Sequence, residues 1–326
     1  MNILITGGGG FIGYHLACYH IGLGDNVTLV DSLYKQEGEV DPEFEKLSQS
    51  PLVQVALLDM TKPIKLKLQH SIDIAYHLAA INGTRLFYER PYEVARNNLL
   101  LTLNLLDWLE EQGVRRLIYT STSEVYAGAE QVGLLNIPTD ETVPVVFPQP
   151  TDVRFSYGTS KFMGEFLCFE FGKLRNIPTT VIRYHNIYGP RMGSKHVIPE
   201  FIIRLNSKEN PFRIYGGDET RSFCYIDDAV KATHMIAAEG KCDGEVIHVG
   251  NAGAETKIAD LAQQMMALMQ LDIPIREEGR RSGSVKRRCP DVSKLNLLTG
   301  FNARVSLKDG LVPTIDWYLA REKSVE

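Results

Sequence analysis

The sequence lacks the features of secreted, membrane-spanning and metal-binding proteins. It has only five cysteines in 326 residues, and they are scattered, odd in number and without CxxC or zinc-ligand spacing. No run approaches eighteen uninterrupted apolar residues, and no charged leader or cleavage site precedes the first β-rich segment. We therefore expect a cytoplasmic protein with reduced, mostly buried thiols and no bound metal.

The sequence also has no excess of basic residues. Its 35 Lys and Arg against 40 Asp and Glu give a formal net charge of −5, which argues against a nucleic-acid partner. Hydrophobic residues make up 44% and charged residues 23%, ordinary values that exclude disordered and fibrous classes. A chain of this length has room for a large domain and a smaller one.

The first thirteen residues predict a strand, a glycine turn and a helix. Residues 1–5 are apolar, and the chain continues Thr6, Gly7, Gly8, Gly9, Gly10, Phe11, Ile12, Gly13. Glycines let the backbone approach a pyrophosphate closely, and the N–H groups and dipole of the following helix stabilise its charge. We expect this segment to bind a dinucleotide, with either GxGxxG or GxxGxxG spacing.

An acidic residue after the second predicted strand indicates which dinucleotide is bound. Residues 26–30 form that strand and Asp31 follows it, at about the position where a Rossmann unit places the carboxylate that bonds the adenosine ribose. A carboxylate there repels a 2′-phosphate. The expected cofactor is therefore NAD rather than NADP.

Strand-like and helix-like segments alternate through the first half of the chain. Further strands are expected at 53–58, 74–78, 117–120, Thr179–Tyr184 and Val246–Val249, and the clearest helices at 11–21, 92–111 and 157–173. This alternation predicts an α/β fold, a Rossmann-type doubly wound parallel sheet. The last two helices are apolar over a wide face, which we expect to pack on the sheet or on a second subunit.

The pattern becomes irregular after residue 190. We expect one domain to comprise residues 1–184 plus about 224–250, and a smaller mixed α/β domain to comprise 185–223 and 251–326. Helices are expected at 228–238 and 309–321. Residues 275–290, rich in Arg and Gly, are predicted to form a loop.

Tyr157 and Lys161 lie four residues apart near the start of a predicted helix, so both side chains project from one face. A tyrosine is a poor base at neutral pH, but an adjacent ammonium and a positively charged nicotinamide both favour phenolate. Upstream, residues 117–120 lead into Ser121, Thr122, Ser123 and Glu124 at the carboxyl end of a strand, where open α/β sheets bind ligands. A core tyrosine beside a snorkelling lysine is the alternative.

These residues resemble the extended short-chain dehydrogenase/reductase family, in particular its NAD-dependent nucleotide-sugar epimerase/dehydratase/decarboxylase group. The resemblance covers nearly the whole chain. It rests on the glycine run with Gly7, Gly10 and Gly13, on Asp31, Asp59, His77-Leu78-Ala79-Ala80, Asn98, Thr122, Tyr157 with Lys161, and on residues 183–191 and 221–228.

The resemblance implies that the first domain binds NAD and the smaller one a nucleotide-diphosphate sugar. It assigns Asp31 to the adenosine ribose, Asp59 and Met60 to the surroundings of the adenine, and Lys161 to the nicotinamide ribose. The implied cofactor-binding residues are Gly7, Gly10, Phe11, Ile12, Gly13, Asp31, Asp59, Met60, Leu78, Ala79, Ala80, Asn98, Tyr157 and Lys161.

The implied reaction begins with oxidation of the sugar at C4. Tyr157 removes the proton of the C4 hydroxyl as a hydride leaves for NAD, and Thr122 shares a short hydrogen bond with that hydroxyl. The product is a transient 4-keto sugar, whose carbonyl acidifies C5. Thr122, Glu124, Tyr157 and Lys161 are the expected catalytic residues.

Glu124 indicates which reaction the 4-keto sugar undergoes. The pattern Thr122-Ser123-Glu124 looks like that of GDP-mannose 4,6-dehydratases and UDP-glucuronate decarboxylases, in which a carboxylate acts near C5. It favours dehydration or decarboxylation of a UDP- or GDP-sugar. The alternatives are a 4-epimerase, in which Glu124 caps a loop or pairs with an arginine, and a non-catalytic NAD-binding regulator.

The substrate-binding residues implied by the resemblance are Ser123, Asn186, Arg191, Arg221 and Arg288. Arginine suits a diphosphate because its planar fork donates two parallel hydrogen bonds. His185 stands where Phe is common, and its alternatives are a contact with the sugar and a satisfied interior histidine. Residues 79–84, followed by Phe87 and Tyr88, are unusual for the loop that faces the sugar, so the identity of the sugar stays open. The apolar faces of the helices at 92–111 and 157–173 predict a homodimer through a four-helix contact, which the family also shows.

Overall fold

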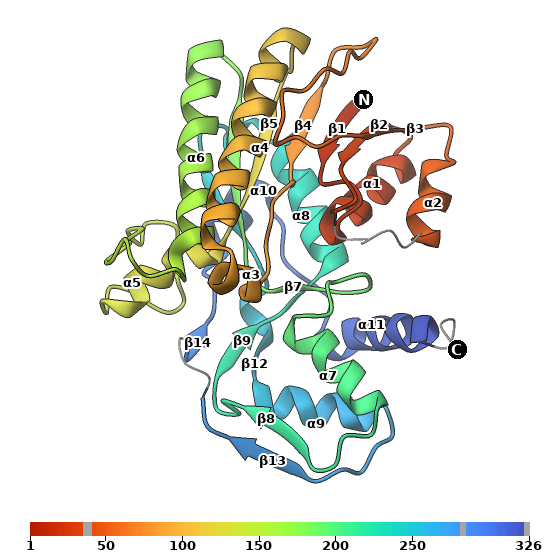
Figure 1. Ribbon diagram of the computed structural model, residues 1–326, viewed down its shortest axis with the longest axis vertical. Coiled ribbons are helices and arrows are strands. Elements are labelled where there is room, and N and C mark those ends of the chain that lie inside the picture. Colours follow the sequence, from red (N-terminus) through yellow and green to blue (C-terminus); the bar gives the residue numbers. More distant parts are fainter. Residues whose placement is uncertain (35–40, 281–284, 323–326) are drawn as a thin grey trace. The chain divides into compact units, whose positions relative to one another are not determined.

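The protein is described by a computed structural model that covers residues 1–34, 41–280 and 285–322 (Figure 1). It divides into two compact units. The first unit comprises Met1–Leu135, Thr142–Tyr184 and Val230–Ile247, and the second unit comprises Asn136–Glu141, His185–Ala229 and His248–Glu326. The assignment of NAD binding to the first domain and of nucleotide-sugar binding to the smaller one stays a prediction.

The first unit is built on a seven-stranded sheet. Its strands are β1 (Asn2–Thr6), β2 (Asn26–Asp31), β3 (Val53–Leu57), β4 (Ile74–His77), β5 (Leu117–Thr122), β6 (Thr179–Tyr184) and β11 (Val246–Val249). The order is β11-β6-β5-β4-β1-β2-β3, and β1 to β6 pair in parallel. The chain order reverses between β1 and β4, so ligands are expected at the carboxyl ends of these strands. The predicted fold class is confirmed.

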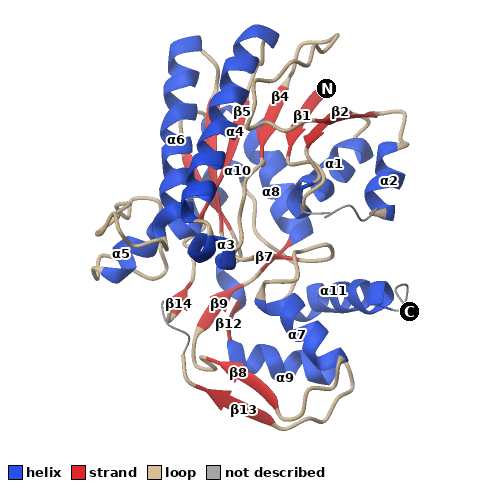
Figure 2. Cartoon of the chain, in the orientation of Figure 1, coloured by secondary structure: helices blue, strands red, loops and turns tan. Residues whose placement is uncertain are grey.

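The first unit also contains helices. They are α1 (Phe11–Gly22), α2 (Pro42–Ser48), α3 (Thr84–Glu89), α4 (Pro91–Gln112), the 3₁₀ turn η2 (Ser123–Tyr126), α5 (Ala127–Gln131), α6 (Phe155–Arg175) and α8 (Ile226–Ala238), which belongs to this unit from Val230 on. The long helices α4 and α6 run side by side (Figure 2). Pro91 starts α4, where its missing N–H is not needed, and Gly113 with φ +78 ends it.

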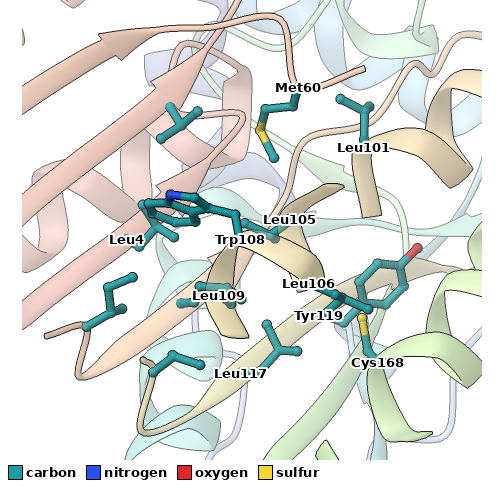
Figure 3. Packing of buried hydrophobic residues seen from close by; sticks show 14 of the residues in the cluster. Leu4, Met60, Leu101, Leu105, Leu106, Trp108, Leu109, Leu117, Tyr119 and Cys168 are labelled. Atoms are coloured by element: carbon teal, nitrogen blue, oxygen red, sulfur yellow. The ribbon is translucent and has the colours of Figure 1, made fainter. Parts of the chain in front are cut away.

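The core of the first unit lies between α4, α6 and the sheet. Leu101, Leu105 and Leu109 repeat at four-residue intervals along α4 and are at most 9% exposed. Figure 3 shows them in one cluster with Leu117 of β5 and Cys168 of α6. Burial of each such apolar side chain stabilises the fold by about 1.5–3 kcal/mol. The same packing holds α6, which carries the tyrosine and lysine of interest, against β5.

The second unit contains short strands and helices. The strand β7 (Ile187–Tyr188) pairs with β10 (Cys224–Tyr225), and β13 (Ile275–Glu278) pairs with β8 (Phe212–Tyr215). In a three-stranded sheet, β9 (Thr220–Ser222) lies between β12 (Glu255–Lys257) and β14 (Arg287–Arg288) and pairs with both. The helices are α7 (Val197–Asn206), α9 (Ile258–Leu268), α10 (Ser293–Thr299) and α11 (Leu307–Glu322). The prediction of a continuous loop at 275–290 was wrong, because β13 and β14 find partners far away in the sequence. Residues 281–284 of that segment lie outside the described residues.

All five cysteines are free, and four of them are buried, as expected. Within the three described ranges, the helices are too short or too polar to traverse a bilayer.

Candidate active site

The glycine run forms a turn in which larger side chains would collide with backbone. Gly7 has φ +74, and a Cβ on it would lie 2.8 Å from a backbone nitrogen in the segment after β4. A Cβ on Gly13, in the first turn of α1, would overlap the carbonyl oxygen of Gly7. Gly10 precedes α1 without a side-chain cap, and Phe11 and Ile12 begin the helix. This geometry fits the close approach of a pyrophosphate to a helix N-terminus.

Asp31 ends β2 beside this turn. Its Oδ2 accepts the N–H of Gly9 at 2.9 Å, and its Oδ1 accepts the N–H of Leu33 at 2.8 Å. The two bonds hold a half-buried carboxylate next to the glycine turn. A ribose 2′-hydroxyl can donate to such a carboxylate, whereas a 2′-phosphate is repelled. The residues present therefore fit NAD.

Asp59 and Met60 follow β3. Asp59 is exposed, and the hydroxyl and amide of Thr61 donate to it at 2.6 and 3.0 Å. The hydroxyl bond is the main cause that lowers the pKa of Asp59. The side chain of Met60 is 3% exposed and belongs to the core. The expected adenine contacts of both residues stay predictions.

The segment after β4 is tied to the end of β1. The N–H of Leu78 donates to the carbonyl of Thr6, and the N–H of Ala79 to its hydroxyl oxygen, both at 3.2 Å. That hydroxyl lies 2.8 Å from Nδ1 of His77. Burial of the His77 ring holds its pKa well below the usual range. Ala80 continues the segment. These bonds fix the two strand ends that flank the reversal of strand order.

Asn98 of α4 joins this segment to α6. Its Oδ1 accepts the N–H of Ile81 at 2.7 Å, and its Nδ2 donates to the Ile81 carbonyl and to Oγ of Ser160, both at 3.1 Å. The Ser160 hydroxyl donates to the carbonyl of Tyr157 at 2.8 Å. The amide of Asn98 thus positions the segment and the start of α6, and its expected contact with NAD stays a prediction.

Tyr157 and Lys161 lie one turn apart on α6, and both are buried. Burial lowers the pKa of Lys161 to about 8. Burial first, and then the charge of Glu124, raise the pKa of Tyr157 above its ordinary value. A tyrosine base at this position therefore needs nearby positive charge, which Lys161 and the nicotinamide of a bound NAD⁺ would supply.

Phe87 of α3 stacks on Tyr157. The ring centroids are 4.8 Å apart and the planes are inclined by 7°. The two rings are 8% and 9% exposed and form a small cluster with Val94. The stack restricts the plane in which the Tyr157 ring can lie. The sequence marked this segment as unusual, but it carried no signal that its phenylalanine faces the tyrosine.

Thr122 ends β5 and caps the turn η2 by accepting the N–H of Glu124 on its Oγ1 at 3.2 Å. The hydroxyl hydrogen of Thr122 is left for another acceptor. A Cβ on Gly158 would lie 3.0 Å from the carbonyl oxygen of Glu124, so the start of α6 lies directly against the turn. The structure therefore brings Thr122 and Glu124 close to Tyr157, with Ser123 buried in the same turn.

A buried ion pair, whose role the sequence analysis missed, holds both ends of η2. Nη2 and Nε of Arg183 donate to the carboxylate of Glu165 at 2.6 and 2.9 Å. The hydroxyl of Ser121, just before Thr122, donates to the same carboxylate at 2.5 Å, and Nη1 of Arg183 donates to the hydroxyl of Tyr126 at 2.5 Å. An arginine inside an apolar strand was the available signal, since buried charges are found paired.

In the second unit, three of the expected substrate residues lie at neighbouring positions. Arg221 of β9 pairs in register with Arg288 of β14, and Nδ2 of Asn186 donates to the carbonyl of Ser222 at 3.2 Å. Arg221 also donates to Oε2 of the buried Glu219 at 3.1 Å. Like charges in register repel each other unless an anion is close. The arginine pair therefore suits a diphosphate.

The remaining expected residues of this unit have different surroundings. Arg191 lies outside the three-stranded sheet, in the turn after β7, with φ +68. His185 is 2% exposed, and its ring centroid is 4.4 Å from that of His248, which is fully buried. This packing favours a structural role for His185.

Comparison with known proteins places this geometry in a family. Residues 3–250 match the model of the NAD dependent epimerase/dehydratase family. The chain is 35% identical over 326 residues to the UDP-N-acetyl-α-D-glucosaminuronate decarboxylase of Bacillus cytotoxicus, with 97% of each chain covered. It is 31% identical over 322 residues to UDP-glucuronic acid decarboxylase 6 of Arabidopsis thaliana, with 95% of this chain and 87% of the relative covered.

Solved structures of epimerases also match this chain over nearly its whole length. The UDP-glucuronic acid 4-epimerase from Bacillus cereus, in complex with UDP-glucuronic acid and NAD, matches with a TM-score of 0.82 at 27% identity, with 98% of this chain and 100% of the other covered. The matched family segment contains the glycine turn, Asp31 and the Tyr157 and Lys161 pair. The chain belongs to the NAD dependent epimerase/dehydratase family, and NAD is its cofactor.

Proposed function

We propose that the protein is an NAD-dependent decarboxylase of a UDP-linked uronic acid, acting through a 4-keto intermediate. The observation that carries the proposal is the position of Glu124, a carboxylate in the turn after β5 whose backbone lies against the start of α6. Two relatives are decarboxylases of UDP-linked uronic acids by name, which favours a UDP-sugar over a GDP-sugar. Both names are those of enzymes, which argues against a non-catalytic NAD-binding regulator.

In the first step Tyr157 acts as the base at C4. NAD, held by the glycine turn and Asp31, would supply a reversible hydride acceptor for C4. Tyr157 takes the proton of the C4 hydroxyl, while Thr122 holds the same oxygen with a hydrogen bond. The ammonium of Lys161 stabilises the phenolate form of Tyr157 by its charge.

In the second step Glu124 acts as the acid at C5. A ketone at C4 makes the C6 carboxylate that of a β-keto acid. The C5–C6 bond breaks, CO₂ leaves, and the electron pair moves onto the C4 oxygen as an enolate. Glu124 then donates a proton to C5, which restores the ketone. A carboxylic acid in this turn is what this step needs and a simple epimerisation does not.

The second unit would hold the diphosphate. We assign this role to Arg221 and Arg288, whose register places their guanidinium groups on neighbouring strands. Asn186 and Arg191 are assigned to the groups that flank the diphosphate. Ser123, in the first unit, is assigned to the sugar.

The test is a panel of UDP- and GDP-linked sugars that includes UDP-glucuronic acid and UDP-N-acetylglucosaminuronic acid. Loss of CO₂ from a uronic acid, measured by mass spectrometry and NMR, supports decarboxylation. Glu124→Gln should lower kcat by roughly two to four orders of magnitude and leave NAD binding unchanged. Absence of CO₂ release from every uronic acid in the panel would rule the proposal out.

A 4-epimerase of a UDP-linked uronic acid is the second candidate. The match to the Bacillus cereus UDP-glucuronic acid 4-epimerase favours it. Epimerisation leaves the C6 carboxylate in place, so the mass of the sugar would not change. Glu124→Gln would then leave turnover nearly intact, because no acid at C5 is required.

We further propose that the protein is a homodimer that pairs through α4 and α6. These helices expose large apolar side chains, with Leu103 at 41%, Met163 at 47% and Phe166 at 58%, more than a monomer needs on one face. Light scattering should give a dimer, and Phe166→Glu should give a monomer. Leu297→Glu on α10, which removes an apolar residue that is 81% exposed, should remain dimeric. A monomeric wild type at micromolar concentration would exclude this dimer.

A cytoplasmic location also remains our proposal. The five free cysteines support it, since reducing compartments keep thiols unpaired. Cell fractionation with an antibody to the native protein would test it.

A further inference from the structure

We propose that the ring of Tyr119 is a positioning element for Lys161, which holds the buried ammonium in place and keeps it charged. Tyr119 lies in β5, three residues before Thr122. The Nζ atom of Lys161 is 4.1 Å from the centroid of the Tyr119 ring, within the range of cation–π attraction. The Tyr119 hydroxyl donates to the backbone carbonyl of Lys161 at 3.3 Å. One side chain therefore contacts both the head and the backbone of the lysine.

Burial opposes the charge of Lys161. The residue is 3% exposed, and burial lowers the pKa of its ammonium to about 8. Glu165, one turn further along α6, is engaged by the guanidinium of Arg183. The face of an aromatic ring carries negative potential without a formal charge, so it can stabilise an ammonium at short range in a dry site.

Cys168 and Glu165 raise the pKa of Lys161, but by less than burial lowers it. The titratable groups that interact with Lys161 are His77 of β4, Tyr119 of β5, and Glu165 and Cys168 of α6. Tyr157 lies one turn earlier on α6, and α4, which packs against α6, carries the buried and non-titrating Asn98 and Thr102. Burial holds the pKa of His77 well below its usual range and raises that of Cys168. At neutral pH the imidazole and the thiol are therefore both uncharged.

Gly164 provides the space that the ring needs. It lies three residues after Lys161 on α6, and a Cβ there would overlap the hydroxyl of Tyr119. Figure 3 shows Leu106 and Cys168 against the same ring, within the core cluster. Glycine inside a helix lowers its stability. Its presence at this position is explained by the close approach of the tyrosine to the helix.

The inference rests on the proposed function, in which Lys161 acts as a cation, and pH profiles test it. Tyr119→Leu removes the ring face, and Tyr119→Phe keeps it. Loss of a desolvated cation–π contact should move the basic limb of the kcat profile down by about one pH unit in Tyr119→Leu. Tyr119→Phe should keep the limb of the wild type. Tyr76→Leu is the matched control, since Tyr76 is a fully buried tyrosine of the neighbouring strand β4.

A second measurement does not depend on activity. In cofactor-free protein, unfolding free energies of the wild type and of Lys161→Met are compared from pH 6 upward in urea, roughly to pH 10. The pH at which the lysine-containing protein begins to gain stability relative to Lys161→Met marks the pKa of native Lys161. It should lie near 8 in the wild-type background, and about one unit lower with Tyr119→Leu.

Equal onsets in the Tyr119→Leu and Tyr119→Phe backgrounds would overturn the inference, whether or not the enzyme turns over. A shifted onset in a protein that converts no UDP-sugar would count against the proposed function alone. Should Tyr119→Leu fail to fold, Tyr119→Met removes the same ring face with a more adaptable side chain, and its onset decides the question.

Discussion

Replacement of Glu165 by glutamine should destabilise the first unit by about 3–5 kcal/mol. The side chains of Glu165 and Arg183 are only 4% and 5% exposed. The guanidinium of Arg183 donates to the two carboxylate oxygens of Glu165 at 2.6 and 2.9 Å. Glutamine would leave a buried guanidinium among neutral acceptors. Burial opposes the charge of Arg183, but the hydrogen bonds and charge of Glu165 hold its pKa above the ordinary value. Arg183 would therefore stay protonated, and its charge would remain buried without a carboxylate partner.

The loss would be large beside the total stability of a domain, about 5–15 kcal/mol. Urea unfolding at pH 7 measures it. With a slope of about 2–3 kcal/mol per molar urea, the midpoint should fall by roughly 1–2 M. Activity should fall with it, because Ser121 loses its carboxylate acceptor and Arg183, which donates to Tyr126, loses the carboxylate that fixes its position.

Two further variants make this test specific. Glu170→Gln on the same helix removes an exposed pair with Lys173 and should change stability by less than about 1 kcal/mol. Arg183→Met added to Glu165→Gln removes the unpaired charge and should recover part of the loss. The reasoning is refuted if Glu165→Gln stays within about 1 kcal/mol of the wild type, or if the second substitution lowers stability further.

Three other substitutions have expected outcomes. Gly13→Ala should weaken NAD binding roughly 10- to 100-fold by calorimetry because its Cβ overlaps the glycine turn, whereas Gly22→Ala meets open space and should bind normally. Lys161→Met should stabilise the protein by about 3 kcal/mol below pH 8, since the buried lysine has a pKa of about 8 against 10.5 when unfolded. Between those values the unfolded state binds more protons, so the stability of the wild type rises with pH and the advantage of the variant in urea unfolding vanishes. Phe87→Leu should lower kcat in steady-state assays roughly 3- to 10-fold, because the stack on Tyr157 is lost. Phe87→Tyr keeps an aromatic ring and should have the kcat of the wild type. An unchanged kcat in Phe87→Leu would contradict this role of Phe87.

The order of strands and helices was predictable because each element is encoded by neighbouring residues. The four-residue repeat of Leu101, Leu105 and Leu109 defines the buried face of α4. The glycine turn was predictable for the same reason, since its demands for φ > 0 and close approach fall on consecutive positions. Both features depend on residues that are close together in the chain, so their patterns can be recognised in the sequence.

Contacts across the fold could not be predicted in this way. Glu165 and Arg183 are 18 residues apart, and the Tyr119 hydroxyl reaches a carbonyl 42 residues away. Contacts between side chains across a parallel sheet depend on the register of the strands and on the placement of the helices. Neither can be predicted from the identity of single residues. The two-residue strand β14 is too short to carry any period, so only its pairing with β9 identifies it as a strand.

If Arg221 and Arg288, which lie in register, bind the diphosphate as proposed, the stability of the second unit would depend on the supply of that ligand. Glu219 offsets part of the mutual repulsion of the two guanidinium groups through its contact with Arg221. A bound dianion would add a free energy of RT ln(1 + [L]/Kd) to the folded state. Such a protein would persist longest where nucleotide sugars are abundant and would be degraded faster when they run out. The concentration of its substrate would then set the amount of the enzyme as well as its rate.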